Sequence, residues 1–241
     1  MTSAFMLTVS FVTTVNMNLL WCVTGAGHLL LESFTLMQCI CSEHEITVAL
    51  SGAGSEVTRM YGLQEAIAHE FKEVISEREQ GYSSPLVGRL AKREYDLVIV
   101  APCTANTVAK IVRGIADSLI TNLVAQAVKS GVPVYIVPTD YEKIQETTMP
   151  MSLNQELCRL CEGCPPLEHC PEHAIYRDDR VRIHGLWCTA CKACIELCTY
   201  ASISFGGKVR VHIRDLDIEN TKRLEKLGGI TVFRSPDAIT V

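Results

Sequence analysis

The chain has 241 residues, of which 48% are hydrophobic and 20% charged, so it can bury one larger and one smaller core, which excludes a largely disordered protein. Its net charge of -5 argues against a protein that binds nucleic acid or a membrane surface by neutralising phosphates. The sequence contains no run of about 18 uninterrupted apolar residues, so no membrane-spanning helix is predicted and we expect a soluble protein.

The N-terminal residues 1–16 carry no lysine or arginine, and the first basic residue of the chain is Arg59. A secretory signal begins with a positively charged segment, so secretion is not expected. We expect residues 1–16 to form an N-terminal extension before a domain that begins at Met17. Twelve cysteines without an export signal indicate a reducing compartment, and we expect the cytoplasm.

Short apolar runs alternate with helical segments along the first part of the chain. The runs cover residues 19–24, 45–50, 96–100 and 132–137. Between the first two, residues Leu30, Phe34, Met37 and Cys41 recur at helical intervals. Strands of this kind are typical of a parallel sheet that is covered by helices on both faces. The predicted fold class is therefore α/β with a doubly wound parallel sheet.

Sheets of this class bind ligands beyond the carboxyl ends of their strands. The turn Gly25-Ala26-Gly27 follows the first run, Ser51 follows the second, and residues 104–107 follow the third. A helix that begins near Thr104 would present free amides that suit a phosphate. A tight turn and an ordinary helix cap explain the same residues without a ligand, so both interpretations stay open at this point.

Eight of the 12 cysteines lie in two short runs, LCRLCEGCPPLEHCP at 157–171 and WCTACKACIELCTY at 187–200. Disulfides are not expected in a mid-sized chain without an export signal. A zinc site would use two CxxC pairs as ligands, and the other four of these eight cysteines would then bind no metal. Three closely spaced cysteines with a fourth from the other run are typical of [4Fe-4S] clusters. We therefore predict a first cysteine set, Cys158, Cys161, Cys164 and Cys198, and a second cysteine set, Cys170, Cys188, Cys191 and Cys194.

Residues 151–206 resemble a bacterial-type ferredoxin with two [4Fe-4S] clusters, which is a small α+β domain. Two departures are visible: five residues separate Cys164 from Cys170 where three are usual, and Thr199 stands where proline usually follows the cysteine. The fourth ligand serves the other cluster, so its local spacing is the least constrained. The remaining cysteines lack metal spacing, and we expect Cys22, Cys39, Cys41 and Cys103 to pack in the core.

The segment VAPCTANTVAKIVRGIADSLITN is similar to the PASANT segment of the FMN-binding flavoprotein family, which includes phosphopantothenoylcysteine decarboxylases and flavin prenyltransferases. WCVTGAGH, SGAGSEV and NTKRLEKLGGITV extend the similarity. The resemblance implies a Rossmann-like flavoprotein domain at 17–150 and 207–241, with the ferredoxin-like domain at 151–206 inserted into it. It also implies FMN as cofactor, held by Gly25, Ala26, Gly27, His28, Ser51, Thr104, Ala105, Asn106 and Thr107.

Two departures from the family bear on the reaction. The stretch PLVGRLAKREYD lacks the histidine that decarboxylases carry there, and VPTDYEKIQETTMP replaces their substrate loop. The nearest resemblance is to archaeal iron-sulfur flavoproteins of the dihydromethanopterin reductase (acceptor) type. It implies an oxidoreductase of tetrahydromethanopterin biosynthesis that passes electrons through two [4Fe-4S] clusters to FMN and reduces a C=N bond of dihydromethanopterin or its sarcinapterin form.

Three readings of the function stay open: this reductase, a ferredoxin-linked electron-transfer flavoprotein without a pterin substrate, and a zinc-stabilised structural domain on a flavoprotein. The implied partners are ferredoxin or another low-potential donor and further copies of the chain, in a homo-oligomer built from trimers. No catalytic residue is assigned. His28 and Tyr82 are weak candidates for the proton donor because they lie in or near the predicted site segments.

Overall fold

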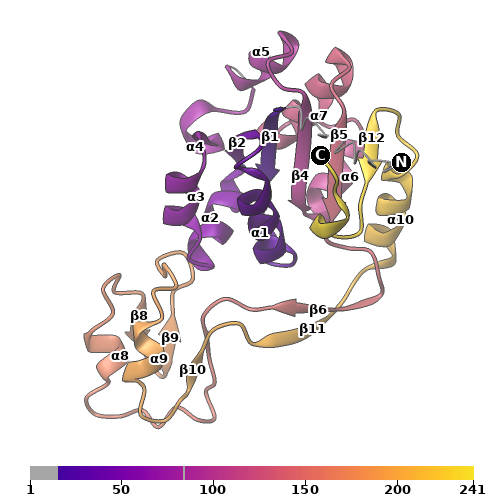
Figure 1. Ribbon diagram of the computed structural model, residues 1–241. Helices are drawn as coiled ribbons and strands as arrows, with labels where there is room; N and C mark the ends of the chain where they lie inside the picture. Colours follow the sequence, from indigo (N-terminus) through magenta and orange to yellow (C-terminus); the bar gives the residue numbers. More distant parts are fainter. Residues whose placement is uncertain (1–15, 84) are drawn as a thin grey trace, which may run out of the picture.

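The computed structural model describes residues 16–83 and 85–241. The expected N-terminal extension therefore lies outside the described residues, apart from Asn16. One six-stranded sheet has the order β12-β5-β4-β1-β2-β3, and every neighbouring pair is parallel (Figure 1). Its strands are β1 (Asn18–Val23), β2 (Glu45–Leu50), β3 (Glu73–Ser76), β4 (Leu97–Cys103), β5 (Val134–Pro138) and β12 (Ile230–Val232). The predicted doubly wound α/β fold is confirmed, while the short edge strand β3 was not predicted.

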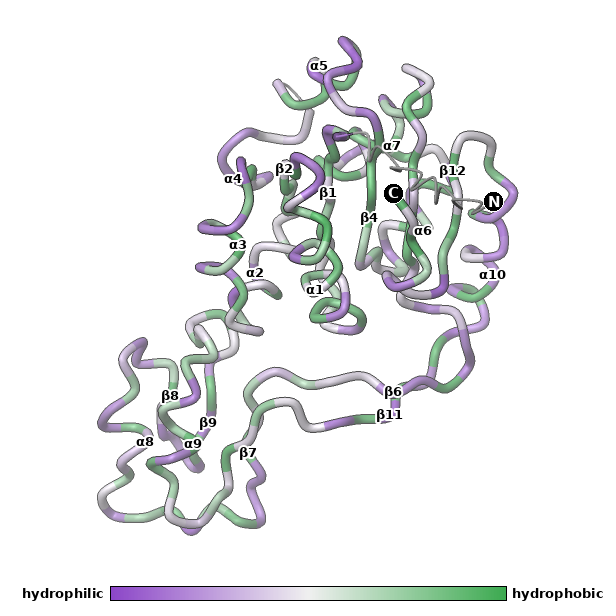
Figure 2. Tube along the Cα trace, viewed as in Figure 1, coloured by the Kyte–Doolittle hydropathy of each residue, from purple (hydrophilic) through white to green (hydrophobic). Residues whose placement is uncertain are grey.

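Helices cover both faces of this sheet, because successive side chains of a strand point to opposite faces. Leu19 and Trp21 belong to one buried cluster, and Leu20 and Cys22 to the other. Figure 2 shows the strands as hydrophobic and the outer helical turns as hydrophilic. The helices are α1 (Leu30–Ile40), α2 (Gly52–Met60), α3 (Gln64–Glu70), α4 (Glu77–Gln80), α5 (Leu86–Ala91), α6 (Ala105–Val112), α7 (Leu119–Ser130) and α10 (Asp215–Leu224), with a 3-10 turn at Pro236–Ala238.

After β5 the chain leaves the sheet along an antiparallel arm of β6 (Ile144–Thr148) and β11 (Lys208–His212), as Figure 1 shows. The arm carries the cysteine-rich residues, and the chain returns through α10 to β12. The elements beyond the arm are β7 (Ser152–Leu153), α8 (Pro165–Glu168), β8 (Ile175–Arg177), β9 (Val181–Ile183), α9 (Ala193–Leu197) and β10 (Ile203–Ser204). The domain boundaries at 150 and 206 stay a prediction. Within the described residues, no helix has the length and apolar character needed to cross a bilayer.

Helix α2 begins directly against the carboxyl end of β1. The Ser51 amide donates to the Val23 carbonyl oxygen at 3.1 Å. The Ser51 hydroxyl caps the helix by accepting from the Gly54 amide at 2.9 Å. A Cβ atom at Gly54 would overlap the Val23 carbonyl oxygen. The missing side chain at Gly54 therefore sets the distance between β1 and α2.

Gly54→Ala is expected to lower the free energy of unfolding by about 1–3 kcal/mol, because the new methyl group must displace backbone atoms. Gly88→Ala is the matched control, since a Cβ at Gly88 meets no atom of the described residues within 4 Å. Alanine is also the better helix former there, by about 1 kcal/mol. Urea titration measures both variants. Equal stability of the two would contradict the close approach of α2 to β1.

Candidate functional site

Three loops meet at the carboxyl edge of the sheet, because β1 lies between β2 and β4. Thr24 follows β1, Ser51 follows β2 and Thr104 follows β4. The chain runs to one side from β1 through β2 to β3, and then crosses to the other side of β1 to form β4 and β5. The carboxyl ends of β1 and β4 thus form the switch point at which doubly wound sheets bind ligands.

The loops after β1 and β4 are joined by hydrogen bonds through a buried threonine. The Thr24 hydroxyl donates to the Pro102 carbonyl oxygen at 2.8 Å and accepts from the Thr104 amide at 2.8 Å. Only 1% of Thr24 is exposed. Thr24 was not singled out from the sequence, because a threonine after a strand carries no pattern of its own. It aligns the two loops on which most of the predicted FMN-binding residues lie.

The nine residues predicted to hold FMN lie on these three adjacent loops. Ser51 and Thr104 are the N-caps of α2 and α6, and the Thr104 hydroxyl accepts from the Thr107 amide at 3.3 Å. Asn106 is exposed in the first turn of α6. Two capped helix starts at one edge of a sheet suit a phosphate group. Both hydroxyls serve as helix caps in this structure, and the contacts of all nine residues with FMN stay a prediction.

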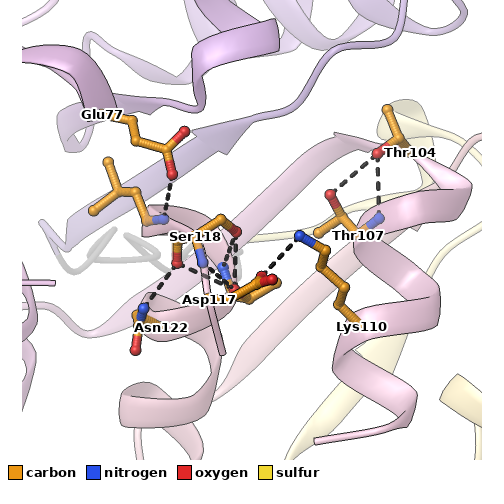
Figure 3. A network of polar contacts seen from close by, with 9 residues as sticks. Glu77, Thr104, Thr107, Lys110, Asp117, Ser118 and Asn122 are labelled. Atoms are coloured by element: carbon orange, nitrogen blue, oxygen red, sulfur yellow. Dashed lines mark hydrogen bonds and ion pairs between the residues drawn. The ribbon is translucent and has the colours of Figure 1, made fainter. Parts of the chain in front are cut away.

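A carboxylate beside these loops connects the starts of two helices, and Figure 3 shows its contact with the start of α7. Glu77 Oε2 accepts from the Gly52 amide at 2.8 Å, and Glu77 Oε1 accepts from the Leu119 amide at 2.6 Å. Negative charge is favourable at helix N-termini, so Glu77 stabilises the first turns of α2 and α7 together. The sequence analysis missed Glu77, since it follows the short strand β3 that was also missed.

His28 lies in a cavity between the loop after β1 and the arm. The cavity is also lined by Gly27, Glu32, Glu146 and Lys208. Burial lowers the pKa of His28 below its ordinary value, and the carboxylates of Glu32 and Asp140 oppose this shift only in part. At neutral pH the imidazole is therefore uncharged.

Tyr82, the other candidate proton donor, lies in the segment between α4 and α5 and is 67% exposed. Within this chain, the structure places His28 on the loop after β1 and Tyr82 on the exposed segment that leads from α4 to α5. The role of either residue as a proton donor stays a prediction.

The cysteine-rich part contains two cavities, and each is lined by four cysteines. The first cysteine set, Cys158, Cys161, Cys164 and Cys198, lines one cavity together with Pro165, Pro166 and Ile203. The second cysteine set, Cys170, Cys188, Cys191 and Cys194, lines the other together with Ile175 and Ile183. Among the described residues, no three cysteine, histidine or acidic side chains already stand close enough to hold a metal ion. The grouping matches the predicted sets, and ligation by them stays a prediction.

The backbone around both cavities has features that suit bound clusters. Of the seven non-glycine residues with positive φ in the described part of the chain, five lie here: Leu160, His173, Ala190, Lys192 and Ala201. Such residues are uncommon, and they tend to gather at functional sites. Backbone amides also donate to sulfur, from Ala174 to Cys170 at 3.3 Å and from Ala190 to Cys188 at 3.4 Å. Hydrogen bonds of this kind tune iron-sulfur clusters.

The four cysteines outside the two sets fall into two groups. Cys22 and Cys103 are fully buried, and burial raises the pKa of both thiols, so they are unreactive core residues as expected. Cys39 and Cys41 are exposed near the end of α1. The expectation that these two pack in the core was wrong, because Cys39 lies on the exposed face of α1 and Cys41 follows the end of this helix at Ile40.

The fold and its three loops define a flavoprotein. A family model described as Flavoprotein matches residues 11–158, and the chain belongs to this family. Dihydromethanopterin reductase (acceptor) of Methanosarcina mazei is 44% identical to it over 229 residues, which cover 91% of this chain and 95% of that protein. The protein of the same name from Methanocaldococcus jannaschii is 43% identical over 232 residues, or 92% of this chain and 94% of that protein.

Among solved structures, DmrB of Burkholderia xenovorans in complex with FMN is similar, with a TM-score of 0.60 and 26% identity over 92% of this chain and 90% of that chain. That protein is described as a cubic protein cage for redox transfer. The resemblance inferred from the sequence is confirmed by these relatives. The protein is thus a flavoprotein oxidoreductase.

Thr24→Val is expected to cost about 1–3 kcal/mol of stability, because it leaves the half-buried Thr104 amide without its acceptor. It also removes one of two hydrogen bonds to the Pro102 carbonyl oxygen, which still accepts from the Thr24 amide at 3.2 Å. It is also expected to weaken FMN binding by disordering the loop after β4. Thr35→Val is the control, since the exposed Thr35 hydroxyl bonds only within its own helix to Leu31. Urea titration and fluorescence titration with FMN measure the two effects. Wild-type stability of Thr24→Val would contradict the role assigned to Thr24.

Proposed function

We propose that this protein is an iron-sulfur flavoprotein that reduces dihydromethanopterin, or its sarcinapterin form, to the tetrahydro compound. In this proposal a ferredoxin-like unit at 151–206 holds two [4Fe-4S] clusters and interrupts an FMN-binding domain at 17–150 and 207–241. The observation that carries the proposal is the pair of four-cysteine cavities. They lie beyond an arm of β6 and β11 whose residues share a cavity with the loop after β1. A reductase that receives single electrons from a low-potential donor and delivers two to an organic substrate uses this combination of one-electron relay and flavin.

The enzyme class is supported directly by the relatives, since two of them are named dihydromethanopterin reductase (acceptor). When bound, FMN supplies the conversion between single electrons from clusters and the two electrons that an organic substrate takes up. Ser51 and Thr104 would fix the helix turns that receive its phosphate group. The uncharged His28 would offer a hydrogen bond to the pterin and would have to take up a proton before donating one.

The proposed partners are a low-potential donor such as ferredoxin and further copies of this chain in an assembly of trimers. The cage formed by the Burkholderia relative supports a homo-oligomer. We place the protein in the cytoplasm, because the eight thiolates of two clusters require a reducing compartment.

Serine variants of the two cysteine sets test the cluster assignment. Cys161→Ser and Cys198→Ser line one cavity, so both are expected to remove the same cluster signal from the EPR spectrum of the reduced protein. Cys170→Ser and Cys191→Ser are expected to remove the other signal. In each case the iron content should fall from about eight to about four atoms per chain. Cys39→Ser, outside both cavities, is the control. Zinc in place of iron, or different signals lost within one set, would contradict the assignment.

Single-turnover oxidation tests the substrate. The FMN- and iron-loaded protein, reduced without oxygen, is expected to be reoxidised by dihydromethanopterin and to form one tetrahydro product for each two electrons lost. Absorbance follows the flavin, and chromatography identifies the product. Protein that stays reduced with the pterin but is rapidly oxidised by a partner protein would instead support the electron-transfer flavoprotein.

A further inference from the structure

The second cysteine set is held against helix α2 by an ion pair and by close backbone packing. Arg59, in the last turn of α2, contacts Glu172 through Nη2 and Oε2 at 3.1 Å and donates to the Trp187 carbonyl oxygen at 3.3 Å. At Gly62, with φ +72°, a Cβ would lie 3.2 Å from the Thr189 carbonyl oxygen. Glu172, Trp187 and Thr189 are close in the chain to members of the second cysteine set, and Glu172 and Thr189 also line its cavity. This part of the cysteine-rich unit therefore packs on the carboxyl end of helix α2.

An aromatic pair continues from this contact to the loop after β1. Lys192, which lines the cavity of the second cysteine set, lies over the Phe205 ring with Nζ 4.4 Å from its centroid. Phe205 meets Tyr61 edge to face, with centroids 6.2 Å apart and planes at 74°. Tyr61 is 7% exposed, and its hydroxyl donates to the Thr148 carbonyl oxygen in the arm. The same hydroxyl fills the space in which Gly27 would carry a Cβ.

These contacts form one continuous path from the second cysteine set to a loop that is predicted to hold FMN. The first cysteine set is not part of this path of contacts. Its cavity is lined by residues within 153–166, 177–181 and 198–203, all of which belong to the cysteine-rich unit. The second cavity differs, since Lys192 on its wall reaches Phe205, and Phe205 packs with the core of the flavoprotein sheet. The two sets therefore have unequal positions relative to the flavin loops.

We propose that Tyr61, Phe205 and Lys192 form a bridge that makes the second cysteine set the inner relay, next to the flavin, and the first set the outer relay, which receives electrons from the donor. The three are positioning residues, since they hold the inner relay against the flavin loop. The inference rests on the proposed function, because it assumes that both sets hold [4Fe-4S] clusters and that the three loops hold FMN.

The electron balance of the transfer is simple. Each passage moves one electron: the low-potential iron-sulfur donor is oxidised by one electron, each cluster returns to its oxidised state, and the flavin gains that electron. Two passages, with protons taken from solvent, reduce one FMN fully. No bond of the protein is made or broken, so the side chains of the bridge act only through position and contact.

Phe205→Leu tests the bridge in the full-length, FMN- and iron-loaded protein. After rapid reduction of the clusters by photoreduced deazaflavin, flavin reduction is expected to slow about tenfold or more, equivalent to about 1.4 kcal/mol in the barrier. Amide hydrogen exchange at residues 188–192 is expected to become faster, since their contact with α2 is weakened. Tyr176→Leu, which removes an exposed aromatic side chain from β8, is the control and should change neither measurement.

Two further measurements keep the outcome decisive. Phe205→Tyr retains the ring and is expected to keep the wild-type rate of flavin reduction and the wild-type amide exchange at residues 188–192. If Phe205→Leu loses FMN or iron, Lys192→Met takes its place as the test variant, and it is expected to slow flavin reduction and to speed the exchange in the same way. Unchanged flavin reduction and unchanged exchange in these variants would overturn the bridge. Oxidation of the directly reduced flavin by dihydropterin is expected to proceed at the wild-type rate in all variants. If dihydropterin fails to oxidise the reduced flavin of the wild-type protein, the proposed function is overturned, whereas the proposal of the bridge is unaffected.

Discussion

The close approach of β1 to the start of α2 is the constraint on which the rest of the structure depends. Because Gly54 has no side chain, the first turn of α2 lies against the Val23 carbonyl oxygen at the carboxyl edge of the sheet. Ser51 then caps the helix at the loops that are predicted to hold FMN, while Arg59 and Tyr61 lie at its other end, against the cysteine-rich unit. A helix of nine residues is about 13 Å long. Helix α2 therefore sets the distance between the loops at the carboxyl edge of the sheet and the cysteine-rich unit.

Much of this architecture could be predicted from the sequence, because parallel strands buried on both faces read as apolar runs. The runs at 45–50 and 96–100 correspond closely to β2 and β4. Strand β3 was missed since its four residues are half-buried at the sheet edge and lack such a run. Glu77 was missed with it, and Tyr61 was missed because its partners lie 87 and 144 residues further along the chain, at Thr148 and Phe205. Long-range contacts of this kind leave no local pattern.

The cysteine sets were the most predictable part of the site, because cluster ligation imposes a spacing that few other functions share. The structure places the fourth cysteine of each set in the cavity of the other run's triplet, which is the crossed arrangement that the spacing favours. The spacing carries no information about which set faces the sheet. That asymmetry comes from the arm of β6 and β11 and from the packing of residues 185–190 on the end of α2, both of which depend on the folded chain.

An anaerobic crystal structure of the protein loaded with FMN and iron tests the central claim most directly, since anomalous scattering locates the iron atoms without reference to the chain. The account predicts two four-iron clusters, one held by each cysteine set, with FMN at the loops after β1, β2 and β4 and the cluster of the second set nearer to it. Zinc at the cysteines, FMN away from the carboxyl edge of the sheet, or a first-set cluster nearer to the flavin would contradict it.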